Sequence, residues 1–95
     1  MNSEILPIAL FRAGNVVATP HALECLTPAD INRGLQRHLA GDWGEVSEND
    51  SAANNRAVVE RTRILSAYNA SNGTRFWIIT EADRSATTIL LPQDY

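Results

Sequence analysis

The sequence contains no lysine, one cysteine and few aromatic residues, and these shortages exclude several classes of protein. All eight basic residues are arginines, and eleven acidic residues bring the formal net charge to −3. Non-specific binding to nucleic acid or to an anionic membrane normally needs a clustered basic face, which this balance argues against. We therefore do not expect nucleic acid as a partner.

The lone cysteine, Cys25, excludes an internal disulfide and a metal centre built from cysteines. Because a chain without disulfides is typical of a reducing compartment, we expect a cytoplasmic location. The two histidines, His21 and His38, lack the spacing of a metal-binding motif. The glycine patterns typical of nucleotide binding are also missing, so the sequence predicts neither a metal site nor a cofactor.

Long hydrophobic runs are absent as well, and nothing approaches the length that crosses a membrane. The first residues lack a basic segment followed by a cleavage site, so we expect no signal peptide. Ninety-five residues is a usual size for one domain, here 1–95. Because so short a chain has a thin core, dimerisation would be an easy way to bury more surface.

Three segments carry the start signals of helices. Thr19–Cys25 and Thr27–Gly41 each begin with a capping hydroxyl followed by proline, which suits the first helical position. The second of these has apolar residues spaced by four and ends at a glycine. Ser47–Arg61 begins with another capping sequence and has helical composition. The expected apolar contacts of this third helix are Ala53, Ala57 and Val58.

The last third of the chain predicts a three-stranded antiparallel meander. Ile64–Ala70 and Thr74–Thr80 flank Asn72-Gly73, the preferred pair of a type I′ hairpin turn. Ala86–Leu91 is the third strand of the meander. The fold class is therefore α+β, with two to three short helices packed on an antiparallel sheet. Two shorter apolar runs are further candidate strands: Ile5–Phe11 and Val16–Ala18.

The middle strand of this meander has large apolar side chains on both faces. Because alternate residues of a strand face opposite sides, Phe76 and Ile78 share one face, while Trp77 and Ile79 share the other. We expect helices to cover one face. A strand, a loop or a second subunit should cover the other.

Several side chains are candidates for binding a partner protein. Trp43 lies between two glycines in a loop, where an exposed tryptophan would be a typical binding hot spot. A tryptophan that closes the core would suit the same glycines. The acidic residues around it could dock on a basic partner, or stabilise the start of the next helix. The six candidates are Asp42, Trp43, Glu45, Trp77, Asp83 and Arg84.

A second hypothesis is cleavage of RNA by general acid–base catalysis. It requires the fold to bring a base, an acid and a phosphate clamp together, and the candidates are His38, Arg63 and Glu81. Cross-strand ion pairs explain the arginine and the glutamate equally well without catalysis. Helices followed by an antiparallel sheet loosely resemble the compact ribonuclease toxins, but the basic surface that those toxins use on RNA is missing here.

Three segments carry a more extensive resemblance: Gly41–Gly44, Ile64–Tyr68 and Phe76–Pro92. They resemble a group of short proteins, without an assigned activity, encoded on bacterial plasmids, prophages and other mobile elements. The likeness runs from about Val17 to the last residue. It implies a setting in which small acidic proteins often counter host defence or tune plasmid maintenance.

On this basis we expect a small non-catalytic protein-binding module with an anti-defence or plasmid-maintenance role. The alternatives are a toxin-like ribonuclease and a structural homodimer.

Overall fold

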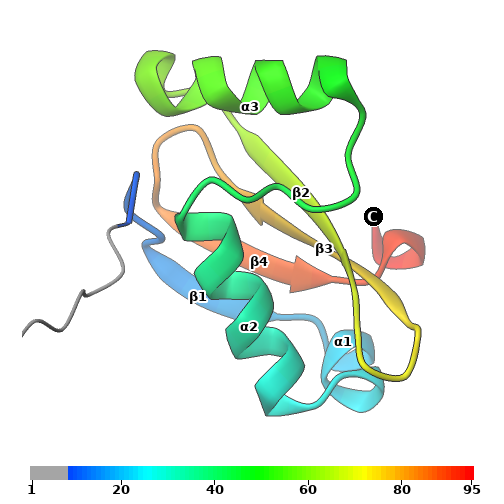
Figure 1. The fold of residues 1–95 in the computed structure, drawn as a ribbon. Helices are drawn as coiled ribbons and strands as arrows, with labels where there is room; N and C mark the ends of the chain where they lie inside the picture. Colours follow the sequence, from blue (N-terminus) through cyan, green and yellow to red (C-terminus); the bar gives the residue numbers. More distant parts are fainter. Residues whose placement is uncertain (1–8) are drawn as a thin grey trace, which may run out of the picture.

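Four strands form one sheet in the computed structural model, which describes residues 9–95 (Figure 1). The strands lie in the order β1-β4-β3-β2. β2 (Ile64–Asn69), β3 (Arg75–Thr80) and β4 (Ala86–Leu90) form an antiparallel meander, and β1 (Asn15–Ala18) pairs with β4 in parallel. The predicted α+β class and C-terminal meander are confirmed. The sheet as a whole is mixed and not purely antiparallel as predicted, because three helices separate β1 from the meander and allow it to pair with the last strand in the same direction.

Of the two N-terminal apolar runs, Val16–Ala18 is a strand, as part of β1. The expected strand at Ile5–Phe11 falls mainly outside the described residues, and residues 9–11 do not form one. Leu10 instead donates its backbone N–H to the carbonyl oxygen of Leu39 at 2.8 Å. This hydrogen bond places the chain before β1 against the end of a helix.

The three helices begin where the sequence predicts. They are α1 (Pro20–Cys25), α2 (Pro28–Leu39) and α3 (Glu48–Glu60). A side-chain oxygen before each helix accepts a backbone N–H of its first turn, which satisfies a group that has no partner inside the helix. The three capping residues are Thr19, Thr27 and Ser47.

The turn between β2 and β3 differs from the predicted type I′ turn. Gly73 has a φ of 87° and donates its N–H to the carbonyl oxygen of Ala70 at 2.9 Å. Asn72 has no positive φ, although a type I′ turn requires one at both central residues. The connection is therefore a three-residue loop, in which a turn through Ser71 and Asn72 is followed by a left-handed glycine.

The helices cover one face of the sheet, which we call the helix face, and Figure 1 shows α2 lying across it. Most of its buried apolar residues form one cluster with α1 and α2, whose strand members are Tyr68, Phe76, Ile78 and Ile89. A second cluster contains Trp43, Ala57 and Ile64.

The opposite face carries Trp77 and Ile79, and we call it the open face. The short turn η1 (Pro92–Asp94) and Tyr95 cover part of it, with the rings of Trp77 and Tyr95 5.6 Å apart. Trp77 is half-buried there. The prediction that different material covers the two faces is confirmed, with a loop on the second.

The apolar contacts predicted for α3 are only partly confirmed. Ala57 is buried, Val58 is half-buried, and Ala53 is exposed. The helix instead turns the polar Asn54 toward β2, where its side chain donates to the carbonyl oxygen of Leu65 at 2.8 Å and accepts from its N–H at 3.3 Å. One side-chain amide thus pairs with the edge of the strand.

A chain of polar side chains crosses the core on the helix face. His38 is fully buried, with Nδ1 2.6 Å from Oγ of Ser66 and Nε2 2.8 Å from Oγ1 of Thr80. Oγ1 of Thr80 lies 2.7 Å from Oγ1 of Thr87. Thr87 in turn donates to the carbonyl oxygen of Ala13 at 2.7 Å.

The carbonyl at the end of this chain determines the direction of every hydrogen bond in it. Because a carbonyl oxygen only accepts, the single hydroxyl proton of Thr87 goes to Ala13. Thr87 therefore accepts from Thr80, and Thr80 accepts from Nε2–H of His38. In the neutral ring, Nδ1 accepts the hydroxyl proton of Ser66. The network therefore places the proton of a neutral His38 on Nε2.

Burial, together with the positive charge of Arg84, lowers the pKa of His38 from 6.5 to about 4. In the unfolded chain the imidazole has its ordinary pKa near 6.5. Between these two values the unfolded state binds a proton that the folded state does not. The stability contributed by the neutral ring is therefore complete above pH 6.5 and is lost as the pH falls toward 4.

We expect the free energy of unfolding to fall by about 3 kcal/mol between pH 7 and pH 4, since each pH unit between the two pKa values is worth about 1.4 kcal/mol. Urea unfolding at intervals of one pH unit measures this slope. The control is His38→Gln, which keeps a donor and an acceptor but does not titrate. Equal slopes for the two proteins would contradict the assignment to His38.

Candidate functional site

The three residues considered for RNA cleavage lie on opposite sides of the sheet. His38 is on the helix face, bonded to Ser66 and Thr80. Arg63 and Glu81 are on the open face, where Nε of Arg63 lies 3.8 Å from Oε1 of Glu81 and both side chains are nearly half exposed. Because the sheet separates the ring from the ion pair, the three cannot act on one substrate atom. The three candidates of the ribonuclease alternative therefore form no common catalytic site.

Trp43 is buried, with 4% of its surface exposed. Its ring stacks on Phe11 at a centroid distance of 6.2 Å and meets the ring of His38 edge-on at 6.0 Å. The indole N–H donates to the side-chain oxygen of Asn55 at 2.9 Å. The hypothesis of an exposed tryptophan anchor is therefore wrong, and Trp43 closes the core beneath α3.

Arg84 is buried too, with 6% of its surface exposed. Its guanidinium donates to the carbonyl oxygens of Thr62 at 2.7 Å, Ala57 at 2.8 Å and Glu81 at 3.1 Å. The carbonyl of Ala57 belongs to the last turn of α3, where the helix dipole favours a cation. Arg84 thus joins the β3–β4 turn to the end of α3, and little of the residue predicted to contact a partner lies at the surface.

The carboxylates among the candidates remain exposed, but two of them bond within the fold. Asp42 accepts from Nε of Arg37 at 2.7 Å, and this hydrogen bond lowers the pKa of the carboxyl. Asp83 accepts from the backbone N–H of Ser85 at 2.9 Å, and hydrogen bonding from that residue lowers the pKa of Asp83. The side chain of Glu45 is exposed. Asp42 and Glu45 share the loop between α2 and α3, while Asp83 lies in the turn between β3 and β4.

The free edge of β1 is a feature that the sequence analysis missed. Asn15 and Thr19 donate their N–H groups to β4, so the intervening Val17 also faces β4, while Val16 and Ala18 turn their backbone groups outward. Among residues 9–95 no strand pairs with this outer side. The side chains of Val16 and Val17 are 45% and 49% exposed, one on each face of the sheet. Only three-dimensional pairing reveals this edge.

The other edge of the sheet is closed by the chain itself. Ala67 of β2 donates to the carbonyl oxygen of Trp43 at 3.1 Å and accepts from the N–H of Glu45 at 2.7 Å. The side chain of Asn54 forms hydrogen bonds with the backbone N–H and carbonyl oxygen of Leu65 on the same edge. Since exposed edges invite pairing with another chain, the two edges differ in what they offer to a partner.

Comparison with protein-family models, with curated proteins and with solved structures finds no match for this chain. Within residues 9–95, no helix has the length and apolar character needed to cross a membrane. The same residues contain no group of three or more histidine, cysteine or acidic side chains placed to hold a metal ion.

We expect Arg84→Leu to lower the free energy of unfolding by about 2–4 kcal/mol, because it removes the hydrogen bonds of a buried, charged guanidinium to three carbonyl oxygens. Chemical denaturation measures this loss. Arg56→Leu, which changes an exposed arginine of α3, should alter stability by less than about 0.5 kcal/mol. A stable Arg84→Leu protein would contradict the structural role.

Proposed function

We propose that this chain is a non-catalytic protein-binding module that takes up an extended segment of a partner protein along β1. The free edge of β1 is the observation that carries this proposal. Its outward N–H and C=O groups match those of another strand, and Val16 and Val17 offer apolar contacts on the two faces. Main-chain hydrogen bonds give affinity in this mode of recognition, and alternate side chains give specificity.

The length of β1 favours a peptide-like partner over a second copy of the chain. β1 has four residues, and pairing it with its own copy buries far less than the roughly 1,200 Å² that a stable dimer interface needs. An extended segment binds adequately to such an edge, because transient recognition requires less area. The buried positions of Trp43 and Arg84 remove the main support for docking through the loops.

The setting of the module is part of the proposal. The resemblance to proteins of mobile elements suggests a host defence protein or a plasmid-maintenance protein as the source of the segment. The acidic balance of the chain agrees with a protein partner, since it disfavours nucleic acid. Binding would then act by occupying a segment that the partner needs.

The test uses peptides selected on the purified protein from a random display library. Val16→Pro removes an outward N–H without removing a hydrogen bond to β4, so we expect the fold to persist and binding to weaken at least tenfold. Ala52→Lys is the control, because Ala52 is an exposed residue of α3 away from β1, and it should bind normally. Titration calorimetry measures both affinities.

Hydrogen exchange gives an independent measurement of the same contact. A bound peptide should slow exchange at the amides of Val16 and Ala18, which point outward in the free protein. Full affinity in Val16→Pro would overturn the proposal. A dimer in light scattering that Val16→Pro abolishes would assign the edge to a second copy instead. Growth arrest with RNA cleavage by the wild-type protein would favour the ribonuclease alternative.

A further inference from the structure

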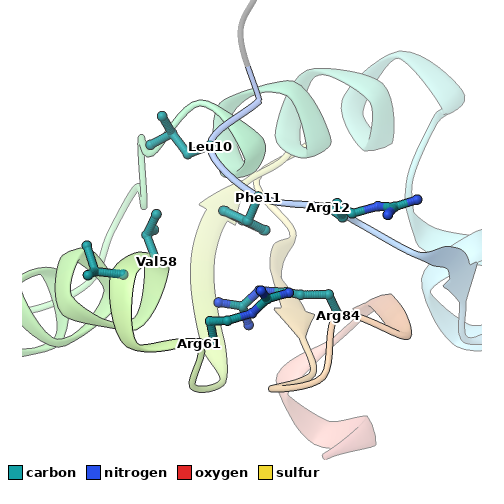
Figure 2. A pocket seen from close by; sticks show the side chains of 7 residues that line it. Leu10, Phe11, Arg12, Val58, Arg61 and Arg84 are labelled. Atoms are coloured by element: carbon teal, nitrogen blue, oxygen red, sulfur yellow. The ribbon is translucent and has the colours of Figure 1, made fainter.

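A cleft with a volume of about 370 Å³ opens beside the chain segment that precedes β1 (Figure 2). Its size lies within the usual range for pockets that bind small molecules. One side is apolar and is formed by Leu10, Phe11, Val58 and Val59. The other side is cationic and is formed by Arg12, Arg61 and Arg84. We call this site the arginine cleft.

Two positive charges meet in the arginine cleft without a negative charge to offset them. Figure 2 shows the side chains of Arg61 and Arg84 next to each other below Phe11, whereas Arg12 points away from them. Among residues 9–95, no carboxylate lines the cleft and neither Arg61 nor Arg84 forms an ion pair. The repulsion between the guanidinium groups would be relieved by a bound anion. The charge of the cleft is therefore opposite in sign to the net charge of −3 that the whole chain carries.

The fold also leaves a donor of Arg84 available. The hydrogen bonds that hold this guanidinium use Nη1 and Nη2, and none of those formed by the described residues uses Nε. No described side-chain nitrogen is both sealed from solvent and without a partner. The Nε–H group therefore meets solvent, on a side chain that lines the arginine cleft and that its other contacts hold in place.

The backbone at both arginines is unusual. Arg61 and Arg84 each have a φ of 61°, and they are the only non-glycine residues among 9–95 with a positive φ. Arg61 ends α3 in the left-handed conformation, a position that glycine adopts without steric cost. An arginine is therefore held there at the expense of stability. Because glycine would end the helix without this cost, we attribute the arginine at this position to its side chain.

We propose that the arginine cleft binds a carboxylate that is attached to an apolar group. The carboxylate lies between the guanidinium of Arg61 and the Nε–H of Arg84, because arginine donors match the two oxygens of a carboxylate. The apolar group packs on Leu10, Val58 and Val59, the first and last of which are 50% and 81% exposed in the free protein. This site is separate from the edge of β1 and goes beyond the function proposed above.

Two sources supply this chemistry: a free organic acid, and the C-terminal residue of a peptide. The experiment uses octanoate for the first and a short peptide ending in leucine for the second, with its C-terminal amide as control. Each is titrated into the full-length protein while the Nε–H signal of Arg84 is followed by ¹⁵N NMR. We expect saturable shifts with octanoate, with the peptide acid or with both, and none with the amide.

The ligand that binds more tightly identifies the source. Inorganic phosphate is the comparison for charge alone, because it lacks an apolar group. Phosphate binding as tight as that of the carboxylates would overturn the proposal, since the apolar wall would then contribute nothing. Absence of saturable binding by both carboxylates, or equal binding of the peptide and its amide, would also overturn it.

Arg61→Gly separates binding from folding. It removes the guanidinium and relieves the left-handed backbone, so we expect a melting temperature at or above that of the wild type and about tenfold weaker carboxylate binding. Arg56→Gln removes an exposed arginine of α3 outside the cleft and should leave affinity unchanged. Equal weakening by both variants would indicate general electrostatics and overturn the site.

Two further variants complete the design. Val59→Asn places a polar group on the apolar side of the cleft. It should weaken the binding of octanoate several-fold and leave the binding of phosphate unchanged. Val16→Pro should bind carboxylates as the wild type does, because β1 does not line the cleft. Failure of the β1 proposal and failure of the arginine cleft can therefore be told apart in one set of proteins. Unchanged octanoate affinity in Val59→Asn would overturn the proposed orientation.

Discussion

A neutral imidazole in the core holds the two layers of this protein together. His38 comes from α2, and its hydrogen bonds reach β2, β3 and, through two threonines, β4 and the chain that enters β1. Each hydrogen bond in this chain has one direction, so the network specifies how the helix lies on the sheet. Replacing the ring by an apolar group would leave buried hydroxyls without partners.

Polar side chains also determine what the edges of the sheet can do. Asn54 and the loop from Trp43 to Glu45 form hydrogen bonds with backbone groups at the edge of β2. Arg84 donates hydrogen bonds to carbonyl oxygens where α3 ends. The chain therefore uses its buried polar groups to close one side of the sheet and to fix a turn. The opposite side, at β1, has no such cover among the described residues. The proposed binding edge follows from this asymmetry.

Local signals predicted local structure, and they failed where distant parts of the chain meet. The hydroxyls of Thr19, Thr27 and Ser47 identified the helix starts, because a cap acts within one turn. Neither the pairing of β1 with β4 nor the burial of Trp43 has a local signal, since both depend on contacts far along the sequence. The nuclease hypothesis failed for the same reason, because residue types do not reveal which face of a sheet they occupy. The arginine cleft likewise joins three separate segments.

The parallel pairing of β1 with β4 has a consequence for how the protein is made. The first strand of the sheet finds its partner only after the last strand has left the ribosome. Until then α1 and α2 have no complete sheet to pack on, and the apolar residues that they bury remain accessible. Contacts between such distant segments slow folding, because a long loop must close before they form. We therefore expect the meander to form first and β1 to dock as the final step.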